Sequence, residues 1–218
     1  LNFSGTEIQQ KWANSGAEAI VMLGWTEIRQ QIVQVDPTTG VAVLSGDAGG
    51  SAVGIPEDID SRYFVENAPE TVDVAREWYL DRSSGQLSYW PGDGENLTRA
   101  EVVAPALTQL VRLEGNAAAN QIIRNVSFRG LHFCDADWDL PNEGHSDHPQ
   151  AAVEIGAAFE ADGAQHWTIE DCSFERLGRY AIWFRTGCQE NRIVGNQISD
   201  IGAGGIKLGE TVMRENPV

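Results

Sequence analysis

The sequence is short of basic residues. It carries 15 Lys and Arg against 32 Asp and Glu, which gives a formal net charge of −17 at pH 7. This balance argues against a nucleic-acid partner, because binding to phosphates depends on clustered Lys and Arg. It also argues against a polyanionic substrate, which an acidic surface repels unless a metal or a local basic patch intervenes.

Long apolar runs, a signal pattern and a cysteine framework are also missing. No stretch approaches the about 20 apolar residues that cross a bilayer, so no membrane partner is expected. The three cysteines, Cys134, Cys172 and Cys188, are an odd number without CxxC spacing, which does not indicate a disulfide framework. There is no GxSxG, no P-loop and no dinucleotide fingerprint, and we predict no cofactor.

What the sequence does contain is a repeat in its C-terminal third. Residues 168–184 laid over residues 192–208, at an offset of 24, align apolar with apolar side chains: Ile169 with Ile193, Phe174 with Ile198, and Ile182 with Ile206. Earlier copies are indicated at offsets of 41 and 29: Phe128 and Phe133 before Ile169 and Phe174, and Val153 and Ile155 before Ile182 and Phe184. Such a period, built on short strand-like runs between glycines, is typical of solenoids. We predict an all-β fold with a right-handed parallel β-helix of about three coils.

Residues 1–115 do not share this period and predict a β-rich domain, inserted into or flanking the coils of residues 116–218. A short helix is expected over Thr6–Asn14. Hairpins are expected where turn residues interrupt strand-like runs: Ile28–Val35 with Val41–Leu44, and Glu77–Asp81 with Gln86–Trp90. In the repeat region, a long polar excursion, Cys134–Pro149, precedes a predicted strand at Ala151–Ile155.

The two ends of the chain suggest a piece of a longer protein. The sequence starts at Leu1 and closes on Glu215–Val218 just after a completed coil. Solenoids need capping at both ends, so we expect a truncated β-helix. Exposed coil ends predict either self-association or a need for the missing coils.

Several short sequence segments resemble those of a known group of proteins: Arg62–Asn67, Glu77–Arg82, Leu87–Pro91, Gly144–Asp147, Tyr180–Trp183 and Asp200–Ile206. Together they resemble secreted bacterial parallel β-helix proteins, including the β-helix glycoside hydrolase family with fucosidase and xylanase members. The resemblance runs over residues 1–210 and implies a pectate-lyase-like solenoid, a secreted or periplasmic location, and activity on polysaccharides.

The repeat places three charged residues in one column. Asp135, Arg176 and Asp200 each follow an aligned apolar residue by two positions. Neighbouring strands lie ~4.8 Å apart, so Asp135 and Asp200 are expected roughly 10 Å apart at the backbone. Two carboxyls about 6.5–9.5 Å apart fit an inverting glycosidase. The simpler interpretation is that Arg176 bridges two acids in a surface ion ladder.

A second predicted column contains Glu154, Trp183 and Lys207. Each follows an inward apolar residue, so these side chains are expected to point outward. An indole between an acid and a base suits a sugar ring, which stacks on the indole while the charges bind its hydroxyls. The alternative is that Trp183 packs under a neighbouring loop.

A third candidate is the polar excursion itself. It supplies Asp135, Asp137 and Asp139 with Trp138 and His145, a set that provides a general acid or base. It lacks the Gly and Glu of a calcium loop and a third histidine for zinc, so we predict no metal site. The alternative is a loop that Trp138 anchors over the coil.

Together these patterns predict a glycoside hydrolase that acts on a neutral or branched plant or algal polysaccharide or oligosaccharide. Asp200 is assigned as general base and an acid from residues 135–139 as general acid, while Trp183 and His145 position the sugar. Two alternatives remain open: a polysaccharide lyase or epimerase, which needs an electropositive groove, and a glycan-binding fragment without catalytic activity.

Overall fold

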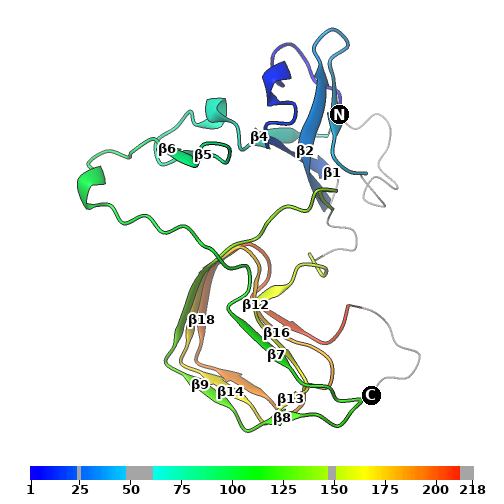
Figure 1. Ribbon diagram of the computed structural model, residues 1–218, viewed down its shortest axis with the longest axis vertical. Coiled ribbons are helices and arrows are strands. Elements are labelled where there is room, and N and C mark those ends of the chain that lie inside the picture. The colour runs from blue at the N-terminus through cyan, green and yellow to red at the C-terminus, as the bar shows by residue number, and fades with distance from the viewer. Residues whose placement is uncertain (24–25, 48–60, 147–150, 212–218) are drawn as a thin grey trace. The chain divides into compact units, whose positions relative to one another are not determined.

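The computed structural model describes residues 1–23, 26–47, 61–146 and 151–211 (Figure 1). The chain is all-β and divides into two compact units, Leu1–Val102 with Leu140–Gln150, and Val103–Asp139 with Ala151–Val218. The predicted domains, residues 1–115 and 116–218, remain a prediction, since compactness alone does not show that a unit folds independently. Within the described ranges, no helix is long and apolar enough to cross a membrane.

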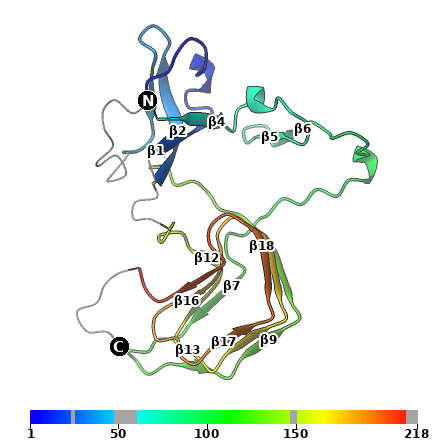
Figure 2. The same cartoon turned by 180° about the vertical axis from the view of Figure 1, so that it is seen from behind.

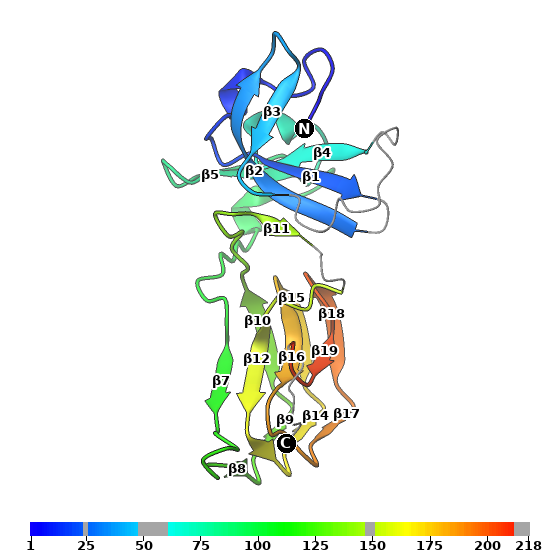
Figure 3. The same ribbon diagram turned by 90° about the vertical axis from the view of Figure 1, so that its right-hand side faces the viewer.

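The N-terminal unit is built on an antiparallel sheet in the order β11-β2-β1-β4, with β3 paired to β2 (Figure 3). Its elements are η1 (Gln10–Trp12), β1 (Glu18–Leu23), β2 (Thr26–Asp36), β3 (Val41–Leu44), β4 (Tyr63–Glu66), η3 (Pro69–Thr71), β5 (Trp78–Asp81), β6 (Gln86–Tyr89), η4 (Leu97–Arg99) and β11 (His145–Ser146). Ile8, Trp12 and Ile32 are buried in the core of this sheet. The helix expected over Thr6–Asn14 is limited to the 3-10 turn η1.

Both predicted hairpins are confirmed, and an aspartate organises the turn in each. In the β2–β3 turn, the Asp36 carboxylate accepts hydrogen bonds from Thr38 N at 2.9 Å and Thr39 Oγ1 at 2.8 Å. In the β5–β6 turn, the Asp81 carboxylate accepts from Ser83 N at 2.9 Å. An aspartate that binds the backbone two residues on is a recurrent turn former.

The second unit contains parallel strands arranged in separate small sheets (Figures 1 and 2). Its strands are β7 (Val111–Glu114), β8 (Ile123–Arg124), β9 (Ser127–Arg129), β10 (His132–Ala136), β12 (Ala157–Asp162), β13 (Ala164–Gln165), β14 (Thr168–Glu170), β15 (Ser173–Leu177), β16 (Tyr180–Phe184), β17 (Arg192–Val194), β18 (Gln197–Ile201) and β19 (Ile206–Leu208). The sheet orders are β10-β15-β18, β19-β16-β12-β7, β17-β14-β9 and β13-β8.

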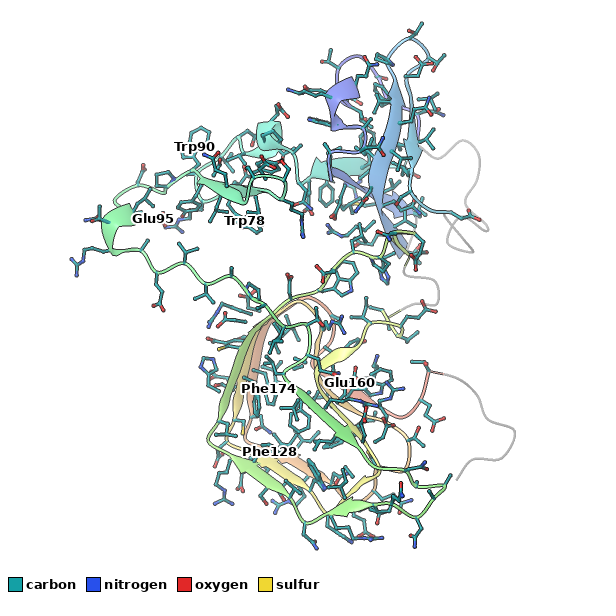
Figure 4. All side chains as sticks on the ribbon, in the orientation of Figure 1. Trp78, Trp90, Glu95, Phe128, Glu160 and Phe174 are labelled. Carbon is teal, nitrogen blue, oxygen red and sulfur yellow. The ribbon has the colours of Figure 1, made fainter. Side chains whose placement is uncertain are left out.

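The parallel registers bring aligned apolar residues side by side. Ile169 pairs with Ile193 at the 24-residue offset, and it pairs with Phe128 at the 41-residue offset. The buried cluster that results is rich in aromatic rings (Figure 4): Phe133 stacks on Phe174 with centroids 4.8 Å apart. The spacing of apolar residues thus predicts the neighbours within these sheets.

Two asparagines bind backbone groups at the bends between strands. Asn191 accepts from Trp167 N and donates to Ala164 O, both at 2.9 Å. Asn196, five residues on, accepts from Cys172 N at 2.9 Å and donates to Ile169 O at 2.8 Å. Each side chain therefore binds one backbone donor and one backbone acceptor at a bend; Ala164 O also accepts from Gln189 N at 3.0 Å.

The prediction of a single right-handed parallel β-helix is wrong. The described strands form several separate small sheets, some antiparallel and some parallel, and only the all-β class stands. In the N-terminal unit, where a separate β-rich domain is predicted, short turns join β2 to β3 and β5 to β6 and impose antiparallel pairing. The parallel strands are only two to six residues long and are separated by bends.

The strand predicted at Ala151–Ile155 is also wrong. Residues 151–154 form a turn, and the strand β12 starts at Ala157. Phe159 of β12 pairs with Ile182, which places β12 23 residues before β16 rather than 29. The alanines of β12 give a weak β-propensity signal, while Val153 and Ile155 give a strong one. The side chains of β12 are nearly all buried, and this burial outweighs the weak strand propensity of alanine.

Candidate functional site

A row of large polar and aromatic side chains crosses the sheet β7-β12-β16-β19. Glu160 pairs with Arg112 on one side and with Trp183 on the other, and Trp183 pairs with Lys207. These residues alternate with Phe159 and other side chains of the buried cluster, so they occupy the opposite face of the sheet. The row contains Trp183 and Lys207 as predicted, with Glu160 in the place assigned to Glu154.

Glu160 is the buried charge of this row (Figure 4). Its side chain is 7% exposed, and it accepts from Ala157 N at 2.7 Å. Arg112 Nη1 lies 3.5 Å and Arg185 Nη1 3.4 Å from Glu160 Oε2. The same two guanidinium groups contact Asp162, at 2.6 Å from Arg112 and 3.5 Å from Arg185. Two carboxylates and two guanidinium groups therefore form one network, which keeps the buried Glu160 paired.

Trp183 is covered rather than open to a sugar. It is 5% exposed, and its Nε1 donates to Gly209 O at 2.8 Å. Lys207 Nζ lies 3.5 Å from the ring centroid and donates to Val153 O at 3.0 Å and Ile155 O at 2.5 Å. Lys207 thereby holds the segment 151–156 beside the indole. The sequence alternative, in which Trp183 packs under a loop, describes this arrangement.

Glu154 lies in that covering segment and not in the row. It is exposed in the turn of residues 151–154. The sequence pattern does not single out Glu160, because it gives no clear strand signal at Ala157–Asp162. The available signal was a single acid between Phe159 and Ala161, which alternation places on the outer face.

Lys207 is expected to contribute stability that rises with pH. Burial lowers the pKa of Lys207 to about 8 from its usual 10.5. Between these two values the unfolded chain binds a proton that the folded chain does not, so the free energy of unfolding increases with pH. The neutral amine still has donors for both carbonyl oxygens. We expect Lys207→Met to lose this rise in denaturant titrations at pH 7.5 and 10; an identical rise in the variant would contradict the assignment.

The predicted column of Asp135, Arg176 and Asp200 lies across β10, β15 and β18. Arg176 Nε donates to Asp135 Oδ1 at 2.7 Å, and Arg176 also pairs with Glu175. The hydrogen bonds that the Asp135 carboxylate accepts from Arg176 and from the Cys134 thiol lower the pKa of Asp135. The structure therefore places Asp135 beside a cation that favours its ionised form.

Asp200 occupies the equivalent position in β18. Asp135, Arg176 and Asp200 all have left-handed backbone, with φ of 60°, 51° and 50°, and each interrupts its strand at the same point. Because β15 lies between β10 and β18, the backbones of Asp135 and Asp200 are roughly 10 Å apart. Among the described residues, no side chain pairs with the exposed Asp200.

The remaining predicted residues lie in the excursion after β10. Asp137 is half-buried and accepts from Trp138 N at 2.8 Å, while Asp139 is exposed. A Cβ on Gly178 would lie 2.6 Å from Trp138 N, so the chain at Trp138 packs closely on that glycine. His145 belongs to β11 of the N-terminal unit, where it pairs with Arg29. No group of three or more metal-ligating side chains occurs among the described residues.

Comparisons with known proteins identify a similar fold. No family model and no curated protein matches the sequence. A solved structure named "Glycoside hydrolase" resembles 98% of this chain with a TM-score of 0.77 at 21% identity. This chain spans 42% of the length of that structure. At this identity the likeness shows the fold alone.

Proposed function

We propose that this chain is carbohydrate-active and belongs to a secreted or periplasmic glycoside hydrolase that cleaves a neutral plant or algal polysaccharide. The observation that carries the proposal is the fold likeness, which extends over 98% of the chain. A fold hosts many activities, so the proposal also requires a site with suitable chemistry. The net charge of −17 supports a neutral rather than an acidic glycan.

Asp135 and Asp200 are the paired carboxylates of this proposal. Glycoside hydrolysis needs one carboxyl that donates a proton to the leaving oxygen and one that acts on the opposite side of the sugar ring. The two aspartates are at matching positions on β10 and β18. Their backbone separation of roughly 10 Å is compatible with the carboxyl separation of about 6.5–9.5 Å in inverting enzymes.

The ion pair between Arg176 and Asp135 supports one division of the two roles. A general acid carries a proton before the reaction, whereas a general base must be ionised. Arg176 lowers the pKa of Asp135, which suits the base that activates water. Asp200 is then the proton donor of the pair. This assignment reverses the one drawn from the sequence, because the sequence does not show which aspartate Arg176 binds.

The test compares Asp135→Asn and Asp200→Asn on two substrates, a natural polysaccharide and an aryl glycoside with a good leaving group. Each variant is expected to lose about 10²–10⁴-fold in kcat on the polysaccharide. Asp200→Asn is expected to regain most of its rate on the aryl glycoside, because that leaving group needs no proton. Asp135→Asn is expected to stay impaired on both.

Asp171→Asn is the matched control, since Asp171 also has left-handed backbone (φ 52°) and is exposed. It is expected to keep full activity with both substrates. Unchanged activity in Asp135→Asn and Asp200→Asn would rule out this pair.

A specific observation argues against catalysis by these carboxylates, which makes glycan binding without catalysis the second candidate function. Arg176 binds both Asp135 and Glu175, and His132 Nε2 lies 3.0 Å from Glu175 Oε1, as in a purely structural ion ladder. Retarded migration in polysaccharide-containing gels, with no reducing ends released, would favour this second candidate.

A further inference from the structure

A surface pocket lies on the β5–β6 hairpin of the N-terminal unit, apart from the residues assigned above. The hairpin lines it with Tyr79, Ser88, Tyr89 and Trp90, and Pro69, Val72 and Pro91 line it beside them. Its volume is about 380 Å³, within the range of about 300–1,000 Å³ for small-molecule sites. None of these side chains is charged.

Hydrogen bonds hold the chain around Trp90 in place. Trp90 N donates to Glu77 O at 2.9 Å, and Trp90 O accepts from Arg76 N at 2.6 Å. The Glu95 carboxylate accepts from Tyr89 Oη at 2.6 Å and from Gly92 N at 2.9 Å, which fixes the turn after Pro91 (Figure 4). The wall of the pocket is therefore ordered before a ligand arrives, which lowers the entropic cost of binding.

We propose that this pocket binds a neutral pyranose ring of a glycan chain, an inference that takes its ligand class from the proposed function. The Trp90 side chain is exposed, at 48% for the residue, although an indole gains free energy on burial. A sugar ring has an apolar face of C–H groups that stacks on an indole and a rim of hydroxyls. The Tyr79 and Ser88 hydroxyls beside the indole are neutral partners for that rim.

The chemistry of the lining favours a neutral sugar over a charged one. A uronate would need a cation in the pocket, and the lining side chains supply none. The overall charge of −17 opposes an anionic ligand further. An aromatic and proline-lined groove also suits a proline-rich peptide, and the experiment below includes that ligand as an outcome.

The hairpin contains its own control residue. Trp78 pairs with Tyr89 across the strands, and Trp90 follows Tyr89, so alternation places the Trp78 and Trp90 indoles on opposite faces of the hairpin (Figure 4). Trp78 is 61% exposed and does not line the pocket. Replacing Trp78 removes an exposed indole of the same hairpin, while its cross-strand partner Tyr89, which lines the pocket, keeps its hydrogen bond to Glu95.

The experiment measures binding of cellohexaose, xylohexaose, hexagalacturonate and a proline-rich peptide to the full chain by isothermal titration calorimetry. Trp90→Ala is expected to weaken binding of a neutral hexasaccharide about five- to twelvefold, since a well-stacked aromatic contact contributes about 1–1.5 kcal/mol. Trp78→Ala is expected to bind as the unaltered chain does. Both positions are exposed, and circular dichroism checks that both variants fold.

Weakened binding in Trp90→Ala alone, for a neutral sugar alone, supports the inference. Equal weakening in both variants, preference for hexagalacturonate or the peptide, or no sugar binding overturns it. Hydrolysis measured in parallel separates this inference from the proposed function. Hydrolysis with unchanged binding in Trp90→Ala overturns only the pocket, whereas Trp90-dependent binding without hydrolysis overturns only the hydrolase.

Discussion

Replacing Phe159 by alanine is expected to lower the free energy of unfolding by about 3–5 kcal/mol. Phe159 is fully buried at the centre of the aromatic cluster of the second unit. Its ring lies 5.2 Å from Phe128, 5.8 Å from Phe133 and 6.5 Å from Phe184, measured between centroids. Three sheets supply these rings, so the cavity left by alanine would remove contacts from all of them.

Chemical denaturation followed by near-ultraviolet circular dichroism measures this loss. Leu208→Ala is the matched control, because Leu208 lies in the same sheet but is 71% exposed. A change within about 0.5 kcal/mol is expected for that variant. A loss below about 1 kcal/mol in Phe159→Ala would mean that the rings around Phe159 do not form a single packed cluster.

Replacing Glu160 by alanine is expected to cost about 2–4 kcal/mol of unfolding free energy. The substitution leaves Ala157 N without its acceptor and removes the buried carboxylate that faces Arg112 and Arg185. The guanidinium side chains are 31% and 36% exposed, so water and Asp162 recover part of the loss. The value is therefore below that of a fully buried pair.

Glu160→Gln separates charge from hydrogen bonding at this position. Its amide oxygen still accepts from Ala157 N, so a cost of about half that of alanine is expected. Urea titration at neutral pH distinguishes the two variants. Small and equal losses of unfolding free energy in Glu160→Ala and Glu160→Gln would mean that the network around Glu160 contributes little to stability. The row across β7, β12, β16 and β19 would then be a solvated ion ladder.

The sequence predicts much of the local structure where side-chain type and spacing agree. The hairpins follow from Asp36 and Asp81 at their turns, since an aspartate there competes directly for backbone donors. The pairing of Ile169 with Ile193 follows from a constant 24-residue spacing. Both features depend on interactions that adjacent segments determine.

The errors arise where distant segments decide the structure. Val153 and Ile155 have the stronger strand propensity, yet burial selects the alanine-rich β12 and leaves them in the segment that Lys207 holds. The same contact covers Trp183, which the sequence pattern leaves open as a sugar platform. The β-helix predicted for residues 116–218 rests on one repeated segment, whereas separate small sheets form there.

The sequence predicts the candidate site only in part, because contacts between distant segments also determine it. Spacing alone places Asp135, Arg176 and Asp200 in one column, because equivalent positions in paired strands are adjacent. The binding of Arg176 to Asp135, which sets the proposed roles, depends on side-chain conformations that no sequence pattern contains. The Trp90 pocket likewise requires η3 beside the hairpin, although its aromatic residues are visible in the sequence.

Release of reducing ends from a panel of neutral and acidic polysaccharides tests the central claim most directly. The account predicts release by the chain from at least one neutral polysaccharide, no release from polygalacturonate or alginate, and loss of release in both Asp135→Asn and Asp200→Asn with folding retained. Release only from an acidic polymer with an unsaturated, ultraviolet-absorbing product, or unchanged release in both variants, would contradict it.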